Sequence, residues 1–302
     1  MAYSVNLLKK TNIYLIDAKV LDGQLLKQYG APPMIGFFDS GFGGLTILRR
    51  VVDLLPEYDY CYLGDNARVP YGNRSQRIVF EFTREAVEFL FRQGCFLIII
   101  ACNTASAKAL RRIQQEYLPY TYPDRRVLGV IRPSVEEVVE LGCRRLGILA
   151  TEGVVASEAY ITEIRKLCSS VEIYQEPCPL LVPLVEAGEQ DSEAADLIIS
   201  KYLQRLFAQN KEIDTILLAC THYPILRKHF ERLLPPQITI LEQGPIVAKK
   251  LKDYLHRHPE IEQKLTKNQT RIFLTTDASS RFDRLALTFF GEAITSHLVS
   301  LS

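Results

Sequence analysis

Two cysteines stand at equivalent places in two similar segments of the sequence. Leu97–Thr104 and Thr215–His222 each consist of an apolar run that ends in Ala-Cys and is followed at once by polar residues. A continuous apolar run of this length is typical of a strand buried on both faces of a sheet. Cys102 and Cys220 are therefore expected at the ends of two strands, one in each half of the chain.

Thiols in such places can move protons at a carbon atom. The alanine-rich stretch after Cys102 favours a helix, whose dipole is expected to lower the pKa of a thiol at its N-terminus. If Cys102 and Cys220 face each other across a cleft, one removes a proton and the other delivers one to the opposite face. The carbon is then inverted without a cofactor. The other five cysteines are expected to be unreactive core residues: Cys61, Cys95, Cys143, Cys168 and Cys178.

Two further titratable residues accompany the cysteines. Asp39 closes an earlier apolar run, and His222 follows Cys220 by two positions. Either could orient a thiol or accept its proton, although Asp39 could also be a plain turn or N-cap residue. A metal site at Cys220 and His222 is a weak alternative, because the only other pair with ligand spacing, His256 and His258, lies in a charged stretch. We expect no metal and no cofactor.

Short polar turns supply groups that could hold a substrate. The turn Ser40–Gly44 lacks the third glycine of the dinucleotide fingerprint and the Gly-Lys-Ser/Thr of a phosphate loop. Its backbone N–H groups and the Ser40 hydroxyl suit a carboxylate. A second turn, formed by Pro70, Tyr71 and Gly72, can add backbone donors. Side chains suited to an α-amino or carboxylate group follow the cysteines directly: Asn103, Thr104 and Thr221.

From Met34 onward, apolar runs of strand length alternate with stretches of helical periodicity. The predicted strands are 34–38, 60–63, 97–101, 127–130, 145–150, 171–174, 215–219 and 239–241. This alternation predicts an α/β fold with two similar, doubly wound domains, each built on a parallel sheet. The loops after the strands would carry the site, in the cleft between the domains.

Composition limits the class of protein further. The chain has 302 residues, enough for two compact domains, and its net charge of +1 gives no field that would attract nucleic acid. Its seven cysteines include no CxxC pair, which favours a reducing, cytoplasmic location. No run of about 18 apolar residues predicts a membrane span, and charged residues interrupt any signal-peptide core near the N-terminus.

Taken together in chain order, five motifs resemble those of the glutamate racemases, in the aspartate/glutamate racemase superfamily. The likeness runs from about Met34 to the C-terminus. The matching segments are Phe38–Gly41 with Gly43–Thr46, Gly64–Asn66 with Pro70–Gly72, Ala101–Ser106, Pro179–Glu186 and Cys220–Pro224.

The resemblance implies two α/β domains and the interconversion of L- and D-glutamate, which supplies peptidoglycan and so supports cell wall biogenesis and cell shape. It implies that Cys102 deprotonates D-glutamate and that Cys220 deprotonates L-glutamate, without a cofactor. Asp39, Glu186 and His222 would assist. The residues that would hold the substrate are Ser40, Pro70, Tyr71, Gly72, Asn103, Thr104, Thr151 and Thr221.

The resemblance also bears on organisation. We expect an N-terminal extension at 1–33, a first domain at 34–128 with 243–302, and a second domain at 129–242. Family members are usually homodimers. Some that carry N-terminal extensions are activated by a nucleotide-linked cell-wall precursor, a muramoyl-alanine nucleotide, so such an activator is a candidate partner here.

The chain departs from the family pattern at two places. Val154 stands where a threonine is common, which puts part of the substrate shell in question, and Glu242-Gln243 stands where Asp-Ser is common, which could alter contacts between domains or subunits. The rival functions are an aspartate racemase on the same scaffold, a lyase or decarboxylase with one working thiol, and a non-catalytic inhibitor of DNA gyrase. The presence of both cysteine motifs argues against a one-thiol enzyme.

Overall fold

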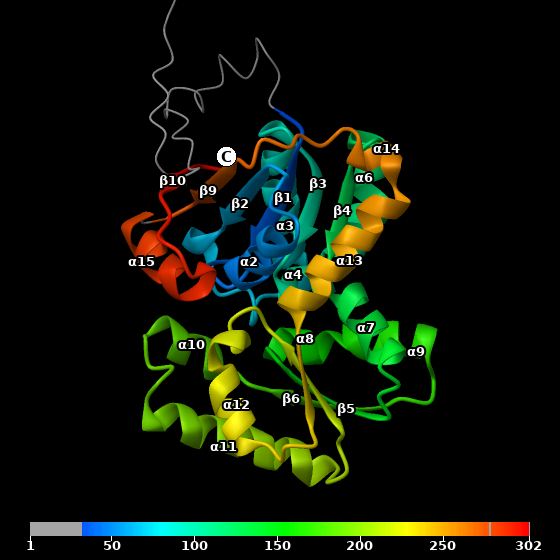
Figure 1. Ribbon diagram of the computed structural model, residues 1–302, viewed down its shortest axis with the longest axis vertical. Helices are drawn as coiled ribbons and strands as arrows, with labels where there is room; N and C mark the ends of the chain where they lie inside the picture. Colours follow the sequence, from blue (N-terminus) through cyan, green and yellow to red (C-terminus); the bar gives the residue numbers. More distant parts are fainter. Residues whose placement is uncertain (1–31, 278, 302) are drawn as a thin grey trace, which may run out of the picture.

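The computed structural model describes residues 32–277 and 279–301, which form two lobes, each built on a parallel sheet (Figure 1). The first sheet has the strand order β10-β9-β2-β1-β3-β4 and the second β6-β5-β7-β8. The first comprises β1 (Met34–Asp39), β2 (Tyr60–Gly64), β3 (Cys95–Ile100), β4 (Arg126–Gly129), β9 (Arg271–Thr275) and β10 (Ser296–Leu298). The second comprises β5 (Arg145–Ala150), β6 (Glu172–Pro177), β7 (Thr215–Ala219) and β8 (Thr239–Glu242).

Helices cover both sheets, so the predicted α/β architecture with two parallel sheets is confirmed. The first lobe carries α2 (Leu45–Leu54), α3 (Gln76–Arg92), α4 (Asn103–Lys108), α5 (Leu110–Arg112), α6 (Leu118–Thr121), α13 (Gln243–Arg257), α14 (Pro259–Glu262) and α15 (Ser279–Phe290). The second carries α7 (Ile131–Glu140), α8 (Glu152–Ser157), α9 (Ala159–Leu167), α10 (Leu181–Glu186), α11 (Glu193–Gln209) and α12 (Arg227–Leu233). Within the described part of the chain, no helix has both the length and the apolar character needed to cross a membrane.

The strands that carry the cysteines lie inside their sheets. β3 lies between β1 and β4, and β7 lies between β5 and β8. Every residue of β1, β3 and β7 is buried, as expected for strands covered on both faces. The loop that follows each of these strands is therefore held by a rigid support.

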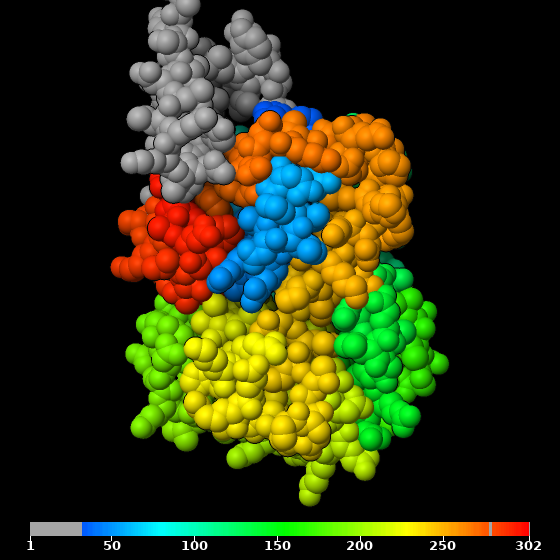
Figure 2. Space-filling model, in the orientation of Figure 1, coloured from blue at the N-terminus to red at the C-terminus, as the bar shows by residue number. Residues whose placement is uncertain are grey.

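The chain passes between the sheets twice. It leaves the first sheet after β4 to begin α7, and it returns after β8 to begin α13. α13 packs against both α2 and α7, and Figure 2 shows α2 and α13 side by side on the surface of the first lobe. We propose domain limits at these crossings, with 34–128 and 243–302 in one domain and 129–242 in the other. Of the predicted extension at 1–33, only residues 32 and 33 are among those described.

β9 and β10 have no counterpart among the strands predicted from the sequence. β9 is held beside β2 by Asp59, which is 1% exposed and comes immediately before β2. Its carboxylate accepts hydrogen bonds from the Asn268 and Thr270 backbone N–H groups at 3.1 and 2.7 Å, and from the Asn268 side chain at 2.9 Å. Asp59 lies more than 200 residues before Asn268 and Thr270 in the chain. The residue pattern around β9 alone therefore could not indicate that the segment joins the sheet.

We expect Asp59→Ala to lower the Tm by about 5 °C or more at pH 7, because it removes the buried acceptor of three hydrogen bonds that hold the start of β9 beside β2. Burial alone would raise the pKa of Asp59, but hydrogen bonds from Thr266, Thr270 and Asn268 outweigh it and lower the pKa below 3.8. The ionised Asp59 carboxylate stabilises the fold above pH 3.8, and this stabilisation is lost as pH falls through its folded-state pKa. The difference in Tm between wild type and Asp59→Ala, measured by calorimetry, should therefore be smaller near pH 3 than at pH 7. The exposed Asp53→Ala is the control; an equal Tm for both variants would contradict the assignment.

Candidate active site

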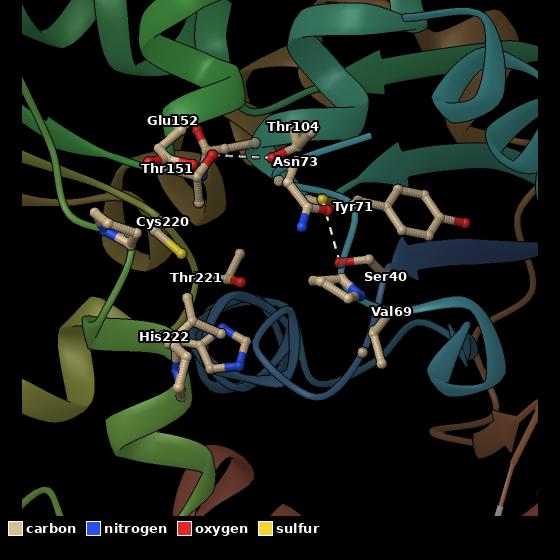
Figure 3. Close-up of a pocket in the computed structure, with 18 of the residues that line it drawn as sticks. Ser40, Val69, Tyr71, Asn73, Thr104, Thr151, Glu152, Cys220, Thr221 and His222 are labelled. Atoms are coloured by element: carbon tan, nitrogen blue, oxygen red, sulfur yellow. Dashed lines mark hydrogen bonds between the residues drawn. The ribbon is translucent and has the colours of Figure 1, made fainter. Parts of the chain in front are cut away.

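The two cysteines open onto one cavity of about 380 Å³ between the lobes. Cys102 lies two residues after the end of β3, Cys220 directly follows β7, and each is 6% exposed. Figure 3 shows Cys220, Thr221 and His222 on one side and Ser40, Val69 and Tyr71 on the other. The lining residues are Ser40, Gly41, Val69, Pro70, Tyr71, Gly72, Asn73, Cys102, Asn103, Thr104, Thr151, Glu152, Cys178, Pro179, Val182, Pro183, Glu186, Cys220, Thr221 and His222.

Apart from Asp39, every residue that the sequence predicted for the site lines this cavity. Asp39 is buried beneath it at the end of β1. Its Oδ1 accepts from the Gly41 backbone N–H at 2.8 Å, and its Oδ2 accepts from the Thr221 hydroxyl of the other lobe at 3.4 Å. Burial raises the pKa of Asp39 against the lowering effect of His222 and of these hydrogen bonds. Asp39 is thus a turn residue that also reaches the second cysteine motif.

The expectation of a lowered pKa for Cys102 is wrong for this structure. Burial, and next the nearby Asp39, raise the pKa of the Cys102 thiol to about 12. The favourable contacts are the Ser40 hydroxyl and the Ala105 backbone N–H, each 3.5 Å from Sγ. α4 has only six residues, so its N-terminus offers a weak dipole and one long hydrogen bond, which do not offset the effect of burial on the thiol pKa.

Cys220 lies beside a cation. The His222 Nε2 atom is 3.1 Å from Glu186 Oε1, which comes from the end of α10. Burial alone would lower the pKa of His222, but hydrogen bonds to Cys220 and Glu186 outweigh it and raise the pKa to about 10. Arg281 of α15 reaches the other oxygen of Glu186 at 3.7 Å. At neutral pH the second cysteine is therefore adjacent to a protonated imidazole.

Two glycines let the lobes approach closely at the cavity. A Cβ on Gly43 would lie 2.1 Å from Thr221 Oγ1 and 2.5 Å from His222 Nδ1. A Cβ on Gly153 would lie 2.3 Å from the carbonyl oxygen of Gly72. Real Cβ atoms are not found so close to other atoms. Any residue other than glycine at either position would therefore push the two lobes apart.

Some cavity residues were not predicted. Asn73 directly follows the predicted turn residue Gly72, and Glu152 directly follows the predicted Thr151. Their place next to predicted site residues was the only sign in the sequence that they line the cavity. Cys178 was assigned to the core; it is buried and also borders the cavity. The apolar lining residues were not predicted to border the site, and only the motif Pro179–Glu186 pointed to some of them: Val69, Pro179, Val182 and Pro183.

Val154 does not alter the cavity. It is fully buried in the core of the second lobe and is not among the lining residues. The hydroxyl on this side comes from Thr151, which lies 3.1 Å from the hydroxyl of Thr104 on the opposite lobe. Residues 32–277 and 279–301 contain no group of three or more His, Cys, Asp or Glu side chains arranged to hold a metal ion.

Comparison with known proteins decides the family. The Asp/Glu/Hydantoin racemase family model matches residues 44–251. The glutamate racemase of Paracoccus denitrificans is 36% identical over 271 residues, 86% of this chain and 97% of that protein. That of Chlorobaculum parvum is 40% identical over 258 residues, 85% of this chain and 92% of its own. This chain belongs to the glutamate racemase family.

Solved glutamate racemases share the architecture. The Francisella tularensis enzyme in complex with D-glutamate superimposes with a TM-score of 0.79 at 33% identity, covering 89% of this chain and 98% of that one. A glutamate racemase isoform from Bacillus anthracis gives a TM-score of 0.81 at 30% identity, with the same coverage of both chains. This chain therefore shares its overall fold with these solved glutamate racemases.

We expect Glu186→Gln to lower the pKa of His222 by at least about one unit, because the variant removes an anion from a buried imidazole. NMR titration of the His222 ring, assigned by its loss in His222→Asn, would measure the change from the starting value of about 10. The exposed Glu189→Gln, just beyond the same helix, should leave the pKa unchanged. An unaltered pKa in Glu186→Gln would show that Glu186 does not hold the proton on His222.

Proposed function

We propose that this protein interconverts L- and D-glutamate by proton transfer at the α-carbon, with Cys102 and Cys220 as the two bases. The observation that carries the proposal is that both strand-end thiols, one from each lobe, line a single cavity. A carbon held between them has one thiol on each face. Membership of the glutamate racemase family supports glutamate as the substrate.

The chemistry needs only the two thiols. The Cys102 thiolate removes the α-hydrogen of D-glutamate, so that the C–H bond breaks and an S–H bond forms. The Cys220 thiol then gives its hydrogen to the opposite face of the carbanion and becomes a thiolate. The reverse reaction begins at Cys220. Since each turnover leaves the pair in the opposite protonation state, the pair must exchange protons before it repeats the same direction.

The two thiols are activated differently. On the side of Cys220, the His222 imidazole, whose pKa is raised to about 10, supplies a positive charge next to the thiol. On the side of Cys102, the buried Asp39 offers no such help, because a neighbouring carboxylate raises the pKa of the thiol. We propose that the α-ammonium group of the substrate supplies the missing positive charge and lowers the pKa of Cys102 when it binds. Closure of the lobes strengthens this effect by removing water.

Neutral donors would hold the two carboxylates of the substrate. No lysine or arginine is among the residues that line the cavity. Hydroxyl and amide groups surround it instead, from both lobes: Ser40, Asn103, Thr104, Thr151 and Thr221. Fixed neutral donors bind a carboxylate without placing a permanent cation beside Cys102.

Aspartate is the nearest rival substrate. The Picrophilus torridus aspartate racemase matches with a TM-score of 0.51 at 16% identity, which is a likeness of fold alone. The relatives named glutamate racemase are far more similar in sequence. We also propose that the D-glutamate serves peptidoglycan synthesis in the cytoplasm and that the protein works as a homodimer. Activation through residues 1–33 stays a prediction, since residues 1–31 lie outside the described part of the chain.

In D₂O, without added pyridoxal phosphate, the enzyme should exchange the α-hydrogen of glutamate for deuterium, because each deprotonation is followed by reprotonation from a solvent-equilibrated thiol. Proton NMR of the α-signal measures the exchange for glutamate and aspartate in parallel. A Cys102→Ala/Cys220→Ala double variant controls for background exchange. Exchange of aspartate but not of glutamate would overturn the substrate assignment.

Cys102→Ala and Cys220→Ala should each reduce racemisation in both directions by at least about a thousandfold, because either change removes one of the two proton carriers. Polarimetry with L- and with D-glutamate measures the rates. The control is Cys168→Ala, at a partly exposed cysteine away from the cavity, which should keep the wild-type rate. Full activity in either single variant would end the two-base mechanism.

A further inference from the structure

A cluster of four buried polar side chains lies where the chain passes between the lobes. Asn103 begins α4 directly after Cys102, Ser134 lies on α7, Tyr160 lies on α9, and Gln243 is the first residue of α13. None is more than 3% exposed. In Figure 1 the start of α13 lies beside α4 and α7 at the boundary between the lobes. The cluster therefore connects the first cysteine motif with both crossings.

Asn103 and Gln243 form a reciprocal pair of amides. The Asn103 Nδ2 atom donates to Gln243 Oε1, and Gln243 Nε2 donates back to Asn103 Oδ1 at 3.2 Å. The Tyr160 hydroxyl also donates to Asn103 Oδ1, at 2.7 Å. The carbonyl oxygen of the Asn103 side chain thus has two donors and no capacity to spare for a ligand.

A backbone carbonyl determines which way round this pair lies. Gln243 Nε2 is 2.9 Å from the Tyr160 hydroxyl, 3.0 Å from Ser134 Oγ and 3.4 Å from the carbonyl oxygen of Val130, at the first crossing. A hydroxyl can donate or accept, but a backbone carbonyl can only accept. If Gln243 were reversed, its oxygen would face the Val130 oxygen. The Ser134 hydroxyl donates its hydrogen to the Val130 carbonyl at 2.7 Å, so it too can only accept from Gln243. Val130 and Ser134 therefore fix Gln243, and Gln243 in turn fixes Asn103 with its nitrogen away from Tyr160.

One N–H of Asn103 then remains for the cavity. The Nδ2 atom carries two hydrogens, and the described residues supply an acceptor for one of them, on Gln243. Asn103 also lines the cavity beside Cys102. A buried donor of this kind, with its orientation fixed, suits a carboxylate oxygen.

We infer that Gln243 is a positioning residue, which holds the Asn103 carboxamide so that it presents an N–H to a carboxylate of the substrate. The inference rests on the proposed function, because it requires a carboxylate substrate next to Cys102. It gives a role to one of the two places where the chain departs from the family pattern. Gln243 itself does not border the cavity and acts only through Asn103.

Gln243→Met tests the inference, because methionine has nearly the same shape and makes no amide hydrogen bonds. Asn103 can then reverse and turn its oxygen toward the carboxylate. The KM for both L- and D-glutamate should rise about tenfold or more, with kcat changed less than about twofold, as expected when ground-state and transition-state binding are lost equally. The control is Gln114→Met, which removes a single bond to the Val127 carbonyl in the same lobe and should leave KM unchanged.

A double-mutant cycle separates positioning from a general structural role. In an Asn103→Ala background, adding Gln243→Met should change KM less than about twofold, because the group that Gln243 orients is gone. A wild-type KM in Gln243→Met with a lowered Tm would overturn the inference and leave a purely structural cluster. An equal rise in KM with and without Asn103 would overturn it as well.

If Gln243→Met does not fold, Tyr160→Phe removes one donor to Asn103 Oδ1 and keeps the ring in the core. A rise in KM of about threefold for both enantiomers supports the inference, and an unchanged KM contradicts it. Wild-type exchange of glutamate in D₂O is measured first. If the wild type fails there, the proposed function fails; if it succeeds and the variants keep a normal KM, only the role of Gln243 fails.

Discussion

Two bases must stand on opposite sides of one carbon atom, and the rest of the molecule follows from this geometric requirement. A single parallel sheet presents its loops at one edge and cannot easily place two groups face to face. Two sheets whose strand ends oppose each other can do so, and Cys102 and Cys220 each follow such a strand. The lobes are joined at the cavity by the Thr46 hydroxyl, which donates to the Thr221 carbonyl at 2.9 Å, and by the Thr221 bond to Asp39.

The similarity of the two cysteine motifs hides an electrostatic difference. Cys220 has the His222–Glu186 pair beside it, whereas Cys102 has the buried carboxyl of Asp39 and two weak hydrogen-bond donors. The protein thus places a positive charge beside the second thiol, and under the proposed mechanism the substrate supplies one beside the first. Such an arrangement keeps a reactive thiolate from forming at Cys102 in an empty, water-filled site.

Local patterns predicted what local forces determine. β1, β3 and β7 were predicted because their continuous apolar runs are buried on both faces. Cys102, Cys220 and their polar neighbours were predicted because loops at strand ends carry chemistry, whereas Glu186 and Thr151 came only from the family resemblance. β9 was missed because its place depends on Asp59, far away in the chain. The pKa of Cys102 was misjudged because burial is a tertiary property that outweighs a short helix. Gln243 was noticed only as a departure from the family pattern. Its hydrogen bond to Asn103 could not be predicted, because Asn103 lies in a distant segment of the chain.

Under the proposed role of Asn103, substrate binding would also affect a hydrogen bond between the two lobes. A carboxylate that accepts from Asn103 Nδ2 polarises the carboxamide and makes its Oδ1 a better acceptor, because hydrogen bonds in series strengthen one another. That oxygen accepts from Tyr160 of the second lobe. Binding of the substrate would therefore strengthen a bond between the lobes, and by reciprocity the fastened state would bind the carboxylate more tightly. Under the proposed role of Asn103, the side chain that binds the substrate carboxylate is thus also one that holds the two lobes together.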